Sequence, residues 1–202
     1  MQKENCESRN GPGFIYLTTD RLILRDHRTE DLTSHHLLLS DANAMRYLPD
    51  IKTQSLAASE TNLAFSLSEI GHAERAHVFL RIEEKETGMH IGEIGYTVSD
   101  FTPMGKLADL GYFTHTHCWN KGFTTEAVRA LLHFAFVQDG LYRMSAGCLL
   151  ENAGSERVMQ KCGFMKEAEF KQFTWHENKL KDRVVYRLLR EEWLIAGQQN
   201  ID

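Results

Sequence analysis

The sequence predicts an α/β protein of the mixed α+β kind, with a mostly antiparallel central sheet flanked by helices. Strand-like runs separated by turn residues dominate residues 77–114, which favours an antiparallel meander. A long apolar helix follows from about Thr124, and further strand-like runs follow that helix. A right-handed crossover through the helix makes the two strands beside it locally parallel, and such sheets bind ligands where they open.

The expected elements follow the order β α α β β β α β α β β. After two short strand-like runs within residues 14–25, we expect helices over 29–40 and 55–70. Strands are expected over 77–83, 90–98, 107–114, 141–150, 167–175 and 183–189, with turns at 85–88 and 101–105 and a short helix over 154–162.

Length and composition predict one domain. The 202 residues suffice for a full core, so we expect a single domain over residues 14–202 behind a flexible leader, residues 1–13. No apolar run approaches the roughly 18–20 residues that span a bilayer, and the N-terminus has no signal-peptide core. These features predict a soluble, cytoplasmic protein without a membrane partner.

Charge and cysteine content argue against several partners and sites. A net charge of −5 is opposite to the basic face that nucleic-acid backbones need, so no nucleic-acid partner is expected. The four cysteines, Cys6, Cys118, Cys148 and Cys162, form no CxxC pair, which argues against a zinc knuckle or a disulfide framework.

Residues 119–137 are the candidate binding element. Their helix is apolar on all sides except one narrow charged stripe, so it should be largely buried. The amides from Asn120 to Thr125 lack partners in the helix, and Gly122 permits close approach of the backbone, which is the chemistry of a phosphate or diphosphate cradle. A plain strand–turn–helix junction has the same features without binding an anion, and Glu126 suits the helix dipole without any ligand.

Four segments in order resemble one family. They are Thr19–Arg25 (TDRLILR), Leu110–Tyr112 (LGY), Trp119–Ala127 (WNKGFTTEA) and Asn152–Phe164 (NAGSERVMQKCGF). They resemble the GNAT superfamily of acyl-CoA-dependent N-acetyltransferases, and within it the branch that acetylates N-terminal alanine and serine of ribosomal proteins. The resemblance covers about residues 14–194 and implies a GNAT-like sheet, splayed at the cofactor site, with acetyl-CoA as the co-substrate.

The resemblance assigns cofactor-binding positions. The diphosphate would bind the amides of Lys121, Gly122, Phe123, Thr124 and Thr125, and the pantetheine arm would pair with the backbone near Phe113 and Thr114. The family's usual R/Q-x-x-G-x-G/A signature is altered here, with Trp119 at its first position and Thr124 at its last. Because backbone amides are the binding groups, we expect the cradle to remain intact.

Asn152 and Ser155 match the N-x-x-S positions of the family. By resemblance, Asn152 would bond to the cofactor arm, and Ser155 would lie near the thioester sulfur as one of two candidate catalytic residues. The competing explanation is structural, because Asn ends strands and Ser caps helices.

Acetyl transfer to an amine also needs a neutral amine at the thioester and a donor to the developing oxyanion. Glu93, the second candidate catalytic residue, and Asp109 lie on strands expected to border the acceptor cleft, where either would accept the amine proton through water. Strand carboxylates that face outward are common without any role, and positioning alone supplies much of the rate. Tyr112 and Tyr142 are expected to pack rather than to act as acids.

His115, His117 and Cys118 suggest a zinc site, since imidazole and thiolate bind Zn²⁺. If the strand persists, alternation puts the histidines on one face and the cysteine on the other, and no fourth ligand is near in sequence. No metal site is therefore expected.

The leading function is an acetyl-CoA-dependent N-acetyltransferase acting on a primary amine, either a protein N-terminal amine or a small amine. The first two helices and the turn near residues 102–106 should form the acceptor cleft. The alternative is a non-catalytic acyl-CoA-binding or protein-interaction module on the same fold. Exposed strands near the carboxyl end also suggest a homodimer.

Overall fold

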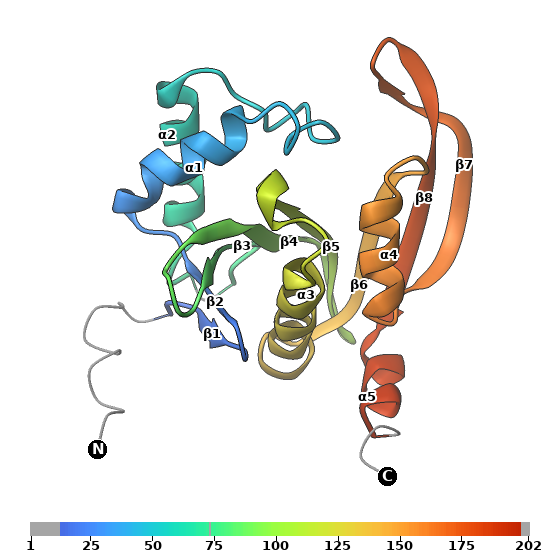
Figure 1. Cartoon of the computed structure of the whole chain (residues 1–202). Coiled ribbons are helices and arrows are strands. Elements are labelled where there is room, and N and C mark those ends of the chain that lie inside the picture. The colour runs from blue at the N-terminus through green and yellow to red at the C-terminus, as the bar shows by residue number, and fades with distance from the viewer. Residues whose placement is uncertain (1–12, 73, 199–202) are drawn as a thin grey trace, which may run out of the picture.

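One mixed sheet forms the centre of the molecule (Figure 1). The computed structural model describes residues 13–72 and 74–198, so the expected leader lies outside the described residues apart from Gly13. In the described residues the strands are β1 (Tyr16–Thr18), β2 (Leu22–Asp26), β3 (His77–Glu84), β4 (His90–Thr102), β5 (Gly105–Thr114), β6 (Leu141–Leu149), β7 (Met165–His176) and β8 (Lys179–Leu189). Their spatial order is β1-β2-β3-β4-β5-β6-β8-β7, and every neighbouring pair is antiparallel except β5 and β6. The predicted mixed, mostly antiparallel sheet with one crossover is confirmed.

Helices cover both faces of the sheet (Figure 1). They are α1 (Leu32–Ser40), α2 (Leu56–Ser68), α3 (Phe123–His133), α4 (Ala153–Lys161) and α5 (Arg190–Gln198). The first two lie on one face, α3 and α4 lie on the other, and α5 follows β8 at the C-terminal end. None of the helices in the described part of the chain combines the length and the apolar character that a membrane span needs.

Strand alternation decides which side chains reach which helix. On β4, Ile94 and Tyr96 belong to the core cluster that includes Leu131 of α3. Glu93 has the opposite direction and bonds to His35 of α1. The α3 side of the sheet is therefore apolar, whereas the α1 side contains buried polar groups.

The predicted buried helix is confirmed, and it ends in a wider turn. α3 begins directly after Gly122, which adopts φ 82°. Its continuation, Phe134–Gln138, is a π-helical turn. Because a π turn changes the direction of the side chains that follow, Val137 is 54% exposed although helical periodicity predicts its burial.

The C-terminal half of the chain holds more regular structure than the sequence predicts. β4 and β5 remain paired as far as Thr102 and Gly105, where the sequence predicts a turn over 101–105. Gly105 closes this hairpin at φ 129°, and a Cβ there would lie 2.5 Å from a neighbouring carbonyl oxygen. The helix α5 was not predicted, and its Trp193 packs against Phe136 with ring centroids 5.7 Å apart.

β5 and β6 separate after a short paired stretch. Their parallel register runs from Lys106 beside Leu141 to Asp109 beside Ser145, and β6 continues in contact with β8 on its other side. From Leu110 to Thr114, the described structure gives β5 no strand partner on the side that faces β6. This opening leaves backbone donors and acceptors of β5 available close to α3 and α4.

Candidate active site

The N-terminus of α3 presents unpaired amides. Asn120 at φ 59° and Gly122 at φ 82° both occupy the left-handed region, so the loop turns sharply into the helix. No described side chain caps this end, and a Cβ on Gly122 would approach only the guanidinium of Arg21, at 3.4 Å. The predicted cradle residues Lys121, Gly122, Phe123, Thr124 and Thr125 all lie in this loop and first turn. The loop therefore fits an anionic group such as a diphosphate.

Arg21 fixes this loop, a role that was not predicted from the sequence. Its Nε donates to Glu126 at 2.7 Å, its Nη1 donates to the Lys121 carbonyl at 3.1 Å, and its guanidinium carbon lies 4.7 Å from the Phe123 ring centroid. Partial burial raises the pKa of Glu126, but hydrogen bonds from Thr19 and Arg21 outweigh burial and lower that pKa below its usual value. Its place in the TDRLILR segment was the available signal.

An open cavity of about 900 Å³ continues from this loop along the outer side of α3. Arg21, Arg129 and Lys161 give its lining positive charge, and Glu126 is already paired with Arg21. The size is within the range of small-molecule sites, and the cations suit a ligand that carries phosphate groups.

Phe113 and Thr114 lie at the end of β5, where the strand pairs with β4 but has no strand partner on the side that faces β6. Phe113 packs against a small buried cluster beneath α1 that contains Leu39 and Met45. The indole N–H of Trp119 donates to the Thr114 carbonyl at 3.2 Å and so ties the strand end to the cradle loop. Trp119 therefore has a structural role at the first position of the altered signature.

Ser155 and Tyr112 meet on the α4 side of the opening. Their hydroxyl oxygens are 2.9 Å apart, and the Tyr112 hydroxyl also lies 3.0 Å from the Ser155 carbonyl oxygen. Burial raises the pKa of Tyr112, so this hydroxyl stays protonated near neutral pH. The expectation that Tyr112 only packs missed this contact, which links β5 to α4.

Asn152 is the N-cap of α4. Its Oδ1 accepts a hydrogen bond from the Ser155 amide at 3.2 Å. The cap is therefore Asn152 and not Ser155, whose hydroxyl is bonded to Tyr112; a bond from Asn152 to the cofactor arm stays a prediction.

Glu93 and Asp109 point to the α1 face of the sheet but differ in exposure. Glu93 is 7% exposed, and its carboxylate bonds to His35 Nδ1 at 2.5 Å. Burial alone would raise its pKa, but the charge of His27 and the bond from His35 outweigh burial and lower the pKa to about 2. Such a carboxylate is a weak base and is not open to the cleft. Asp109 is exposed at the last residue pair before the opening, and Gly111 beside it has free space above its Cα.

His115 and His117 lie beyond the end of β5, because the chain leaves the strand at Thr114 and forms a 3-10 turn over Thr116–Cys118. Their rings stack with centroids 5.3 Å apart. No third metal-ligating side chain among the described residues converges with this pair.

The loop after α1 meets the β7–β8 turn. Arg46 Nε donates to Glu177 at 3.1 Å, and the rings of Tyr47 and His176 lie 5.8 Å apart. The turn near residues 102–106, expected to border the acceptor, lies at the other end of β5, about 30 Å from Thr114 at roughly 3.3 Å per residue. The β7–β8 turn, by contrast, contacts the loop after α1.

Comparisons with known proteins agree with this geometry. The family model described as an acetyltransferase (GNAT) domain matches residues 21–165. An uncharacterized N-acetyltransferase, YnaD, of Bacillus subtilis is 31% identical over 89% of this chain and 99% of its own.

Two solved structures share the fold. Spermidine N-acetyltransferase from Vibrio cholerae, in complex with CoA and spermine, gives a TM-score of 0.75 at 18% identity over 87% of this chain and 99% of its own. Ribosomal-protein-S5-alanine acetyltransferase from Vibrio fischeri gives 0.76 at 18% identity over 89% and 98%.

Proposed function

We propose, because this chain belongs to the GNAT family of acetyl-CoA-dependent N-acetyltransferases, that it acetylates a primary amine by direct attack of the amine on the thioester. The observation that carries this proposal is the opening between β5 and β6, with unpaired backbone on one side and uncapped amides of α3 at its mouth. The match over residues 21–165 supports treating residues 14–202 as one acetyltransferase domain.

The cofactor would bind through the main chain and the adjoining cations. The amides of residues 121–125 would hold the diphosphate, and the backbone at Phe113 and Thr114 would pair with the pantetheine arm. Arg21, Arg129 and Lys161 line the cavity next to the cradle, where phosphate charge of the nucleotide end would be favourable. Asn152, which caps α4, would hold Ser155 at the reacting end.

Ser155 would supply the proton for the leaving thiolate. The amine nitrogen forms a bond to the carbonyl carbon, the carbon–sulfur bond breaks, and the sulfur takes the Ser155 hydroxyl proton. The Tyr112 hydroxyl, which stays protonated, would stabilise the Ser155 oxygen by a hydrogen bond through the 2.9 Å contact. The amine loses a proton to solvent, and a proton from solvent restores the Ser155 hydroxyl.

Asp109 is the better placed carboxylate for the amine. It is exposed on the α1 face at the start of the opening. There it would attract a cationic acceptor and pass the proton of the acceptor amine to water. Glu93 was the other candidate base, but its burial and its bond to His35 favour a positioning role beneath α1.

Two classes of amine are candidate acceptors. Structural neighbours include a spermidine N-acetyltransferase and a ribosomal-protein alanine acetyltransferase, so both a small polyamine and a protein N-terminus are candidates. β7 lies at the edge of the sheet and exposes Phe173 and Trp175, which supports a homodimer as a further proposal.

Release of free thiol from acetyl-CoA tests the proposal. The protein would be incubated with spermidine, with peptides that begin in alanine or serine, and with an aminoglycoside, and each product would be identified by mass spectrometry. We expect thiol release that depends on one acceptor class, with one acetyl group on its primary amine. Absence of acceptor-dependent thiol release across the panel would contradict amine acetylation by this site.

A further inference from the structure

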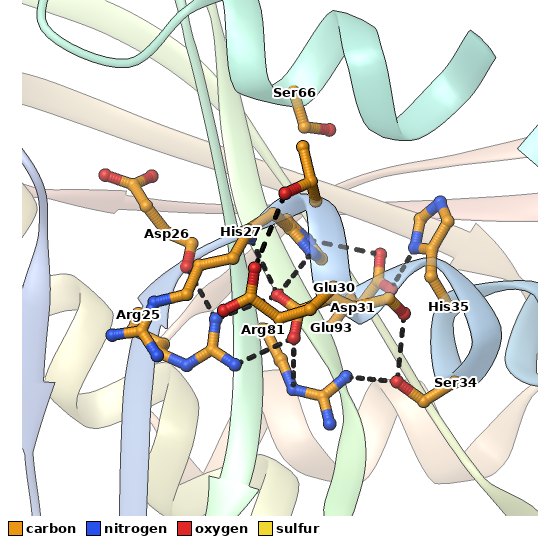
Figure 2. Close-up of polar contacts among 12 residues, drawn as sticks. Arg25, Asp26, His27, Glu30, Asp31, Ser34, His35, Ser66, Arg81 and Glu93 are labelled. Atoms are coloured by element: carbon orange, nitrogen blue, oxygen red, sulfur yellow. Dashed lines mark hydrogen bonds and ion pairs between the residues drawn. The ribbon is translucent and has the colours of Figure 1, made fainter. Parts of the chain in front are cut away.

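Three side chains with metal-binding atoms converge on the α1 side of the sheet (Figure 2). His27 follows β2, His35 lies in α1, and Glu93 lies in β4. One ligand atom from each lies within 4.8 Å of the others. The three residues are 2%, 0% and 7% exposed, so the point where they meet is closed to solvent.

His27 is buried without a hydrogen bond. Neither ring nitrogen has a hydrogen-bond partner among the described residues. Its Nε2 lies 3.8 Å from Glu93 Oε2, and its Nδ1 lies 3.9 Å from Asp31 Oδ2. Buried polar groups are normally paired because water no longer satisfies them. An ion between His27 and Glu93 would satisfy the imidazole nitrogen that faces the carboxylate.

Around the point where His27, His35 and Glu93 meet, one of four carboxylates has no arginine partner among the described residues. Three carboxylates of the network are each paired with a guanidinium group, in the contacts Arg75–Asp26, Arg25–Asp31, Arg25–Glu83 and Arg81–Glu83. The fourth carboxylate, Glu93, has only histidines within ion-pair distance among the described residues. A positive charge is therefore needed beside Glu93, either as a proton or as a metal ion.

The outer nitrogens of the two imidazoles both face an oxygen atom, as those of metal-bound histidines do, but only that of His35 is within hydrogen-bond distance. His35 turns Nδ1 to Glu93 and places Nε2 3.0 Å from Asn62 Oδ1. His27 turns Nε2 to Glu93 and Nδ1 toward Asp31, which Arg25 holds in place. In metal sites, the nitrogen that does not bind the ion points to such an oxygen and thereby orients the ring.

We propose that His27 Nε2, His35 Nδ1 and the Glu93 carboxylate form a buried site for a divalent transition-metal ion of the zinc type. Two imidazoles and one carboxylate are ligands that Zn²⁺ accepts. His90, whose Nε2 lies 3.9 Å from Glu93 Oε1, is the nearest further imidazole. The ion replaces the proton shared by His35 and Glu93, and that proton leaves to solvent.

The geometry requires only small movements. Ligand atoms on one ion with bonds of about 2.0–2.2 Å lie roughly 3.3 Å apart. His35 and Glu93, now 2.5 Å apart, would separate slightly, and His27 would move inward. The ion would connect three segments: α1, the segment after β2, and β4 at Glu93. Glu93 in turn pairs with Phe113 of β5. The sequence did not predict this site, because Glu93 lies 58 residues from His35 along the chain.

Metal retention tests the site directly. The full chain, free of any histidine tag, would be stripped with a chelator, loaded with Zn²⁺ or Co²⁺ and passed through gel filtration. We expect about one ion per chain, visible Co²⁺ absorption of low-coordinate type, and a higher melting temperature with metal than with chelator. X-ray absorption of the zinc form should show nitrogen and oxygen ligands and no sulfur.

Matched variants locate the ion. His27→Leu and His35→Leu should each weaken metal binding at least tenfold, whereas His117→Gln, which changes an exposed histidine of the neighbouring pair, should leave it unchanged. His176→Gln controls for a second group of possible ligands, in which His176 is buried and Glu151 and Glu177 are exposed.

The proposal is overturned by a wild-type protein that retains no ion after gel filtration. It is also overturned by His27→Leu protein that retains as much metal as wild type, or by retention that falls only in the His117 or His176 variant. The wild-type measurements decide the question even if a core variant does not fold.

Discussion

The two faces of the sheet around β5 build their polar sites from different groups. On the α3 side, the cradle proposed for the diphosphate consists of backbone amides, set by the left-handed turns at Asn120 and Gly122. On the α1 side, the polar network consists of side chains from separate segments, such as Arg25, Asp31 and Glu93. A main-chain site tolerates altered side chains, whereas a side-chain network depends on every member. Four changes break or sharpen this contrast.

The largest effect is expected from Asp31→Asn on the α1 side. Asp31 accepts two hydrogen bonds of 2.8 Å from Arg25, and both groups are buried. Loss of the charge leaves Arg25 short of a partner, so the free energy of unfolding in urea should fall by about 3–5 kcal/mol. Glu167→Gln, which removes the partner of Arg143 on the surface, should cost less than about 1 kcal/mol. Equal losses of unfolding free energy in the two variants would show that burial does not determine how much an ion pair stabilises this fold.

Ser155→Ala tests the hydroxyl pair beside the opening. If Ser155 gives its proton to the leaving thiolate, kcat should fall about 100-fold with little change in KM for acetyl-CoA. Tyr112→Phe should lower kcat in the same direction, and the double variant should be little worse than Ser155→Ala because the two act as a unit. Ser99→Ala, an exposed serine on β4, is the control. Independent, multiplying effects would mean that the hydroxyls do not act together.

Gly122→Val tests the cradle. A β-branched residue at φ 82° strains the loop by about 1–2 kcal/mol, so affinity for acetyl-CoA measured by calorimetry should fall about tenfold. Gly163→Val introduces the same strain at φ 85° after α4 with free space around it, and should lower stability without changing affinity. If the Gly122→Val protein is folded and binds acetyl-CoA with unchanged affinity, this loop does not bind the diphosphate.

The smallest effect is expected from Glu83→Gln in acid. Burial raises the pKa of Glu83, but bonds from Arg25 and Arg81 outweigh it and hold the pKa below 4.5. A depressed carboxyl pKa stabilises the fold above its unfolded value, and this stability is lost as pH falls through the folded pKa. The free energy of unfolding should therefore decline below about pH 4.5, with a shallower decline in Glu83→Gln. Parallel pH curves for the two proteins would contradict the pairing.

Local sequence rules predicted regular elements well where a period was strong. The apolar period identified α3, and alternation identified the strands that surround it. The same rules missed α5, which carries Arg190, Glu191 and Glu192 in its first turn and depends on packing of Trp193 against the core. The same rules wrongly predicted that Val137 is buried, because the period of an α-helix does not apply to the π-helical turn.

The candidate site was predictable to the extent that it is made of main chain. Gly122 predicts a turn at this position from local sequence alone, whatever side chains its neighbours have. The sequence identifies Glu93 as a carboxylate on a strand, but nothing in it indicates that Glu93 meets His27 and His35. Nor does the sequence indicate the contact of Tyr112 with Ser155, which is 43 positions away.

The sequence by itself determined the class of sheet, the crossover helix and the loop that turns into it, because φ preferences, hydrophobic period and the unpaired amides of a helix are properties of neighbouring residues. Only the tertiary structure decided which carboxylate is exposed and which is enclosed, and which histidines meet. Burial and charge pairing depend on segments that the fold brings together, such as β2, α1 and β4, and no local rule describes them.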